Sequence, residues 1–269
     1  MGLELSHNSS PTYGVRVRSL CIGVHQRPPV IRKLGFCNVN SATNARELAA
    51  LDREVSVCRQ CPRLVVWREQ AATEKRAAFR DQEYWGRAVP SFGPADARIL
   101  VVGLAPAAHG ANRTGRMFTG DRSGDWLYRA MWRAGLASQP ESTSIDDGLE
   151  LRGTRITSIV RCAPPENRPS TDERDLCLPY LRREFDLLSE LRIILCLGSF
   201  AWENCARELG VRPRPKFAHG LEHRINDRTL ICSYHPSQRN TFTGLLTEEM
   251  LGDVFLRAAQ LAQGGSVDS

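Results

Sequence analysis

Short, strongly apolar segments that alternate with helical patterns are the feature that most constrains this fold. Four of them lie at residues 98–103, 155–162, 191–198 and 229–234. Segments of this length are typical of strands buried on both faces of a parallel sheet. Helical patterns separate or follow them: two have plausible N-caps, at Ser123 and Ser170 (a Ser170-x-x-Glu173 capping box), and two begin at Ser199 and Thr247. The sequence therefore predicts an α/β fold with three layers, α/β/α, around a central, mostly parallel four-stranded sheet.

The sequence divides into a short N-terminal segment and one long domain. Residues 1–43 are rich in Pro, Ser, Asn and Arg without a sustained period, which predicts a mobile N-terminal extension. Residues 44–265 are expected to form a single domain. Since no run approaches the roughly 18 apolar residues that span a bilayer, and the amino end lacks a signal-like apolar core, we expect no membrane segment and a cytoplasmic location.

Charge gives only a weak indication of function. The net charge is +6 and the isoelectric point is about 9.0. Such a balance suits a polyanionic partner, but it suits a generally basic protein equally well.

The cysteines indicate a metal site. The chain has nine cysteines and no sign of export, so ligation or catalysis is favoured over disulfides. Cys58 and Cys61 form a CxxC pair, and Cys162 and Cys177 follow far along the chain without a second CxxC. This spacing does not fit a zinc ribbon; four thiolates could instead hold a [4Fe–4S] cluster, and unrelated core thiols are the alternative. Three further cysteines in apolar segments are expected in the core (Cys196, Cys205 and Cys232), and two fall in the extension (Cys21 and Cys37).

The loop after the first strand, residues 103–121, contains four glycines and several polar groups. Glycines let backbone approach a ligand closely, and successive N–H groups can bind an oxyanion. Neither GxGxxG nor GxxxxGK[ST] is present, so nucleotide triphosphate binding is unsupported. In this loop Phe118 could be a core residue or a stacking platform for a base. Asp121 could favour the start of the next helix or hold a water molecule.

A third unusual segment, residues 235–244, follows the last strand. His235 lies at the strand end and Pro236 stiffens it, which makes this histidine a candidate site residue. Arg239 and Asn240 are expected to face solvent and to suit phosphate or groove contacts.

Four segments together resemble the uracil-DNA glycosylase superfamily, and specifically its iron–sulfur type B branch, called family five. They are CRQCPRL from Cys58, GLAPAAHGANRTGRMFTGD from Gly103, VRCAPPENRP with Cys177 beyond it, and HPSQRNTFTG from His235. The resemblance implies a three-layer α/β/α fold and a [4Fe–4S] cluster held by Cys58, Cys61, Cys162 and Cys177.

The resemblance also implies roles for single residues. Other branches carry an acidic residue early in the first loop, where this chain has only Leu104 to Ala107, so Asp121 is the expected water-orienting carboxylate. Asn167 is the candidate for reading the base edge. The remaining expected site residues are base-contacting or stabilising groups (Gly103, Leu104, Ala105, His109, Phe118 and His235) and DNA contacts (Ser237, Arg239 and Asn240).

The implied function is base excision from DNA. We expect a monomeric, nucleoid-associated enzyme that cuts uracil, and plausibly hypoxanthine and mismatched thymine, from double- and single-stranded DNA. The alternative is a non-catalytic iron–sulfur DNA-binding protein of the same fold.

Overall fold

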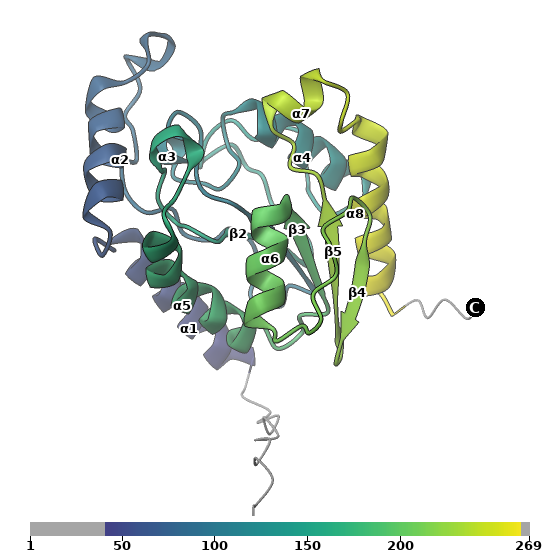
Figure 1. Ribbon diagram of the computed structural model, residues 1–269. Helices are drawn as coiled ribbons and strands as arrows, with labels where there is room; N and C mark the ends of the chain where they lie inside the picture. The colour runs from purple at the N-terminus through teal and green to yellow at the C-terminus, as the bar shows by residue number, and fades with distance from the viewer. Residues whose placement is uncertain (1–40, 265–269) are drawn as a thin grey trace, which may run out of the picture. The chain divides into compact units, whose positions relative to one another are not determined.

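A five-stranded sheet lies at the centre of the structure (Figure 1), a computed structural model that describes residues 41–264. The strands run in the order β2-β1-β3-β5-β4. Their bounds are β1 Ile99–Gly103, β2 Thr154–Ser158, β3 Ile193–Leu197, β4 Glu222–Ile225 and β5 Arg228–Ser233. The first three pairs in this order are parallel, and β4 is antiparallel to β5.

The expected mostly parallel sheet is confirmed, but the expected number of four strands is wrong by one. The missed strand, β4, is an edge strand with the sequence EHRI, in which exposed and half-buried residues alternate. None of its residues is buried, so it lacks the apolar run that marks the four expected segments.

Helices cover both faces of the sheet. Their bounds are α1 Ser41–Ser56, α2 Pro62–Glu74, α3 Ala111–Thr114, α4 Arg122–Arg133, α5 Thr171–Leu187, α6 Ser199–Glu208, α7 Gln238–Phe242 and α8 Glu248–Ala262, with short 3₁₀ turns η1 Ala77–Phe79 and η2 Pro165–Asn167. Leu100 and Val102 of β1 pack in the cluster of α1, α2, α5 and α6, whereas Ile99 and Val101 pack in that of α4 and α8. Since successive strand residues point to opposite faces, β1 is covered on both sides, which explains why it is apolar throughout.

The helix starts follow local sequence signals. The Ser170–Glu173 capping box is confirmed at the start of α5. The helix expected from Thr247 is α8, which begins at Glu248 with Thr247 as its N-cap. The predicted cap of α4 is wrong: the helix begins at Arg122, and Asp121 rather than Ser123 is its N-cap. This difference matters because it gives Asp121 a fixed position.

The predicted extension mostly lies outside the described residues, which begin at position 41. Residues 41–43 already belong to α1. Within residues 41–264, none of the helices has the length and apolar character to cross a membrane.

Candidate active site and cysteine pocket

An open pocket of about 690 Å³ lies beyond the carboxyl ends of the parallel strands. The loops after β1, β2 and β5 all contribute to it, which is where ligands bind in sheets of this kind. Its lining residues are Trp67, Arg76, Phe79, Ala107, Ala108, His109, Gly110, Gly120, Asp121, Arg122, Asp125, Pro164, Glu166, Asn167 and Gln238. We call it the base pocket. Three of the site residues expected from the sequence line this pocket: His109, Asp121 and Asn167.

Asp121 is held in place at both carboxylate oxygens. Its Oδ1 accepts a hydrogen bond of 3.0 Å from the backbone N–H of Gly124, as the N-cap of α4. Its Oδ2 lies against the Cα of Gly110, so close that a Cβ on Gly110 would stand 2.0 Å away. Burial raises the pKa of this carboxyl, although backbone N–H groups of α4 oppose the shift. The result is a preoriented carboxylate in a pocket wall.

Asn167 lies in an unusual turn. Both Glu166 (φ 53°) and Asn167 (φ 56°) adopt the left-handed backbone conformation, which is uncommon outside glycine. Both side chains are exposed in the pocket wall. Non-glycine residues held in this conformation concentrate at functional sites. The turn therefore presents two polar side chains to the pocket.

His109 lines the same pocket. Its Nδ1 lies 3.2 Å from the hydroxyl of Tyr84. Burial lowers the pKa of this imidazole, and the nearby Arg76 and Arg113 lower it further. His109 is therefore neutral at physiological pH.

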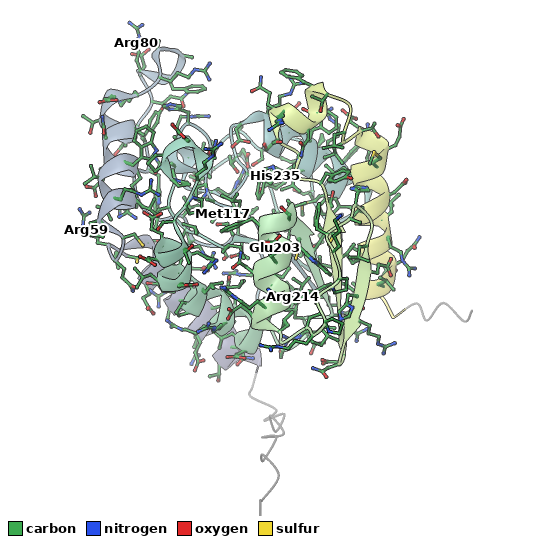
Figure 2. The ribbon with its side chains drawn as sticks, in the orientation of Figure 1. Arg59, Arg80, Met117, Glu203, Arg214 and His235 are labelled. Atoms are coloured by element: carbon green, nitrogen blue, oxygen red, sulfur yellow. The ribbon has the colours of Figure 1, made fainter. Side chains whose placement is uncertain are left out.

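His235, Phe118 and Gly103 form a second group that is not among the lining residues. Figure 2 shows His235 beneath α7, after the end of β5. The rings of Phe118 and His235 are 5.9 Å apart and tilted by 33°, and the Phe118 ring occupies the space that a Cβ on Gly103 would need. Burial lowers the pKa of His235 to about 4, so the ring is uncharged at neutral pH. Phe118 is only 9% exposed and has a φ of 54°, so it belongs largely to the core.

The two residues after Gly103 are half-buried. The carbonyl of Leu104 accepts a 3.0 Å hydrogen bond from the N–H of Val160, and Ala105 packs against the core. They therefore fix the start of the loop.

The expected DNA contacts in α7 have different roles. Ser237 caps the helix, with its Oγ 3.4 Å from the N–H of Asn240. Asn240 is half-buried rather than solvent-facing, and its Nδ2 donates a 2.9 Å hydrogen bond to the carbonyl of His235. Only Arg239 has a fully exposed side chain, as predicted.

Several lining residues were not predicted. Arg122, Asp125 and Glu166 are sequence neighbours of Asp121 and Asn167, and this proximity could have indicated them. Arg122 lies 4.2 Å from the ring of the exposed Phe242 on α7, so it joins two sides of the pocket mouth. Trp67, on a helix that precedes the first strand, carries no signal in the sequence.

The four cysteines implied by the resemblance line a second, smaller pocket, which we call the cysteine pocket. None of the four forms a disulfide. Arg68 Nη1 donates a 2.9 Å hydrogen bond to Cys162 Sγ, and the backbone N–H of Arg161 donates one of 3.3 Å to Cys177 Sγ. Burial raises the pKa of Cys61 to about 11 and that of Cys177 to about 12, so without a bound metal both are protonated at neutral pH.

A buried charge network anchors the segment before Cys162. Arg161 Nη1 donates to Ser91 Oγ at 2.6 Å, and its Nη2 pairs with Glu184. Arg155 bridges Glu184 at 3.2 Å and Asp52 at 2.6 Å. Although burial alone raises it, the pKa of Glu184 falls to about 2 because Arg161 and Arg155 lie beside it. The network therefore holds β2, α1 and α5 in fixed positions around the cysteines.

The remaining five cysteines are not in the ligand set that the resemblance implies. Cys196, Cys205 and Cys232 are buried in the core, as predicted. Cys21 and Cys37 lie outside the described residues.

Comparisons with known proteins agree with the resemblance seen in the sequence. Residues 90–257 match the family model described as "Uracil DNA glycosylase superfamily". The chain is 53% identical over 226 residues to the type-5 uracil-DNA glycosylase of Mycobacterium tuberculosis, covering 82% of this chain and 84% of that protein. It is 54% identical to the Mycobacterium leprae protein of the same name (81% and 97% covered) and 48% identical to that of Thermus thermophilus (79% and 99% covered).

Proposed function

Because the chain belongs to the uracil DNA glycosylase superfamily, among its type-5 members, we propose that it hydrolyses the N-glycosidic bond of uracil in DNA and leaves an abasic site. The observation that carries this proposal is the half-buried carboxylate of Asp121, fixed in the wall of an open pocket that the Asn167 turn also lines. A base inside a duplex is out of reach, so the nucleotide must turn out of the helix into this pocket.

The first test is direct. Purified protein is incubated with a single uracil in a labelled oligonucleotide, and the products are treated with alkali. Strand cleavage at the uracil position is expected, whereas the same DNA with thymine paired to adenine stays intact. An intact uracil strand would support the alternative of a non-catalytic DNA-binding protein.

Asp121 is proposed to orient the attacking water and to stabilise the sugar. Cleavage of the glycosidic bond builds positive charge on the sugar and negative charge on the departing base. A carboxylate that is already held in place stabilises the positive charge without reorganisation during the reaction. It can also accept a hydrogen bond from the water, because only one of its oxygens is engaged by Gly124.

The departing base needs donors for its developing negative charge. We assign this role to the neutral imidazole of His235, with the backbone N–H groups of Gly103, Leu104 and Ala105. Since burial holds the pKa of His235 at about 4, the ring donates a hydrogen bond and does not act as a strong acid. The amide of Asn167 is the proposed reader of the base edge, because the left-handed turn presents it to the pocket.

These assignments predict the pH dependence of excision. The active form has Asp121 deprotonated, and burial raises its pKa, so the rate is expected to fall as pH decreases through this raised pKa. The fall should start at a higher pH than for an exposed aspartate. His235 is already neutral above about pH 4, so no step is expected near pH 6.5. Single-turnover rates from pH 4.5 to pH 9 measure this profile, and a loss of activity on deprotonation near pH 6.5 would contradict it.

Phe118 is proposed to contact the base with the small exposed part of its ring. Phe118→Ala is expected to slow single-turnover excision by about 10–100-fold, since stacking of a base on an aromatic ring is worth roughly 1–3 kcal/mol. The same change leaves His235 with less support, because the two rings are neighbours. Inhibition by free uracil separates the effects: if the variant and the wild type are inhibited equally, the ring does not stack on the base.

The cysteine pocket is proposed to hold a [4Fe–4S] cluster through Cys58, Cys61, Cys162 and Cys177. The residues fit this group. Buried Nε–H groups of Arg68 and Arg161 have no acceptor among the described residues, and cluster sulfurs are suitable acceptors. In residues 41–264 no group of three His, Cys, Asp or Glu side chains is arranged around a single ion. When bound, the cluster would tie the Cys58 segment to α5.

Cluster binding is testable by composition. Iron and acid-labile sulfide are expected in the purified protein, with broad absorption in the visible blue. Cys177→Ser is expected to lower both contents and the melting temperature, while the core variant Cys205→Ser retains iron. Equal iron in wild type and Cys177→Ser would contradict the ligand assignment.

The finer substrate range is also a proposal. The early part of the first loop, from Leu104 to Ala107, carries no carboxylate, so the pocket is expected to accept hypoxanthine and mismatched thymine besides uracil. Binding to double- and single-stranded DNA, a monomeric state and a cytoplasmic location with the nucleoid stay predictions. A panel of oligonucleotides with different damaged bases tests the substrate range.

A further inference from the structure

Helix α2 separates the cysteine pocket from the base pocket. Leu64 and Val65 of this helix line the cysteine pocket, and Trp67 lines the base pocket. Figure 1 shows α2 beside α3, the short helix in the loop that carries His109 and Gly110. A single helix therefore forms part of the wall of both pockets.

Arg68 lies at the centre of this arrangement and is almost fully buried, with 1% of its surface exposed. Its Nη1 donates to Cys162 Sγ at 2.9 Å, and its Nη2 donates to the carbonyl of Cys58 at 3.0 Å. One guanidinium thus holds two of the segments that supply cysteines. A buried charge of this kind persists only where hydrogen bonds compensate its desolvation.

The backbone of Arg68 is tied to the other pocket. The buried amide of Asn112 donates to the carbonyl of Arg68 at 3.1 Å and lies 3.3 Å from the carbonyl of Ala108. Ala108 precedes His109 and Gly110, and Gly110 contacts Asp121. The amide therefore links α2 to the loop that positions the catalytic carboxylate.

The segment after β2 forms another part of the base-pocket wall, and it begins next to Cys162, whose sulfur accepts the bond from Arg68. Cys162 lines the cysteine pocket, and only two residues later Pro164 lines the base pocket, in the segment that leads to Asn167. Fixing the Cys162 side chain therefore fixes the origin of the Asn167 turn. Arg68 therefore acts on both walls of the base pocket. Its guanidinium bonds Cys162, which leads to the Asn167 turn, and its carbonyl accepts a bond from Asn112, next to the loop that carries His109 and Gly110.

We propose that Arg68 is a positioning residue that couples the cysteine pocket to both walls of the base pocket, and that its N–H bond to Cys162 sets the reduction potential of the cluster. This rests on the cluster proposed above. A donor to a ligating sulfur stabilises the negative charge that reduction adds, and hydrogen bonds to the sulfurs are among the factors that set cluster potentials. Without the donor, the cluster is harder to reduce.

The test uses the full-length holoprotein, purified without oxygen, with Arg68→Met and Arg68→Lys. Redox titration followed by visible absorption or electron paramagnetic resonance is expected to show a more negative potential for Arg68→Met. Arg68→Lys, which keeps the charge and can donate one hydrogen bond, restores part of the shift. In Arg68→Met, amide hydrogen exchange is expected to accelerate at residues 107–114 and 163–168, and single-turnover excision to slow by about 10–100-fold.

Two control variants separate the parts of the proposal. Arg59→Gln removes a positive charge between Cys58 and Cys61, where Arg59 is exposed and pairs with Glu69, without removing a bond to sulfur. Its potential should equal that of the wild type. Asn112→Leu, similar in shape, should leave the potential unchanged but accelerate exchange in residues 107–114.

Three results would overturn the coupling. One is an Arg68→Met protein with a full cluster, a wild-type potential and wild-type exchange. Another is an equal shift of potential in Arg59→Gln, which would mark a general effect of charge. If Arg68→Met does not fold, unchanged exchange at residues 107–114 in Asn112→Leu overturns the coupling to the base pocket. Absence of iron from wild-type protein refutes the cluster itself and is seen before any variant is made.

Discussion

Replacing Asp121 with asparagine is expected to slow uracil excision by about 10²–10⁴-fold, the range typical for loss of a positioned general base. Asparagine keeps the shape of the side chain, and its Oδ1 can still accept the hydrogen bond from Gly124 that caps α4. What it removes is the negative charge beside the forming cationic sugar and the acceptor for the proton of the water. Single-turnover kinetics at saturating enzyme measure the effect on the chemical step.

A second substitution at the same position separates catalysis from folding. Asp121→Ala loses the cap as well, which typically costs about 0.5–2 kcal/mol of stability. We therefore expect Asp121→Asn to melt close to the wild-type temperature and Asp121→Ala to melt below it, with similar losses of rate. Binding of uracil-containing DNA should persist in the asparagine variant. An Asp121→Asn enzyme with the wild-type single-turnover rate would remove this carboxylate from the mechanism.

The sequence predicts the position of the site well because the topology determines it. Three loops follow three parallel strands, and the carboxyl ends of such strands meet at one edge. Asp121 and Asn167, far apart in sequence, therefore line one pocket with His109. The resemblance to a known family added the identities of the residues, which composition and spacing alone left open.

What the sequence does not predict depends on packing between distant segments. Trp67 reaches the base pocket because α2 lies beside α3, and no local pattern encodes that contact. Asn240 looks like an exposed polar residue, yet it bonds the carbonyl of His235 and is half-buried. Strand β4 is not predicted because its residues are exposed or half-buried and form no apolar run. The sequence shows that the early part of the first loop has no carboxylate, but it does not show how Asp121 is held in place.

Gly110→Ala is expected to reduce excision by about 10²-fold or more, although residue 110 has no reactive group. A Cβ at this position would lie 2.0 Å from Oδ2 and 2.8 Å from Cγ of Asp121, far inside contact distance. The carboxylate must then move, and a displacement of about 1 Å at a reacting group can cost 10²-fold in rate. The backbone of Gly110 has a negative φ of −102°, so the expected effect comes from the lost space and not from a left-handed conformation.

A glycine elsewhere provides the matched control. Gly252 lies within α8, and a Cβ there would meet no other atom within 4 Å. Gly252→Ala is expected to keep the full excision rate and to gain roughly 0.5–1 kcal/mol of stability, as alanine does inside a helix. Combining Gly110→Ala with Asp121→Asn gives the decisive comparison. If the methyl group acts only by displacing the carboxylate, the double variant is about as slow as Asp121→Asn alone, whereas losses that multiply would show that Gly110 serves the reaction in another way.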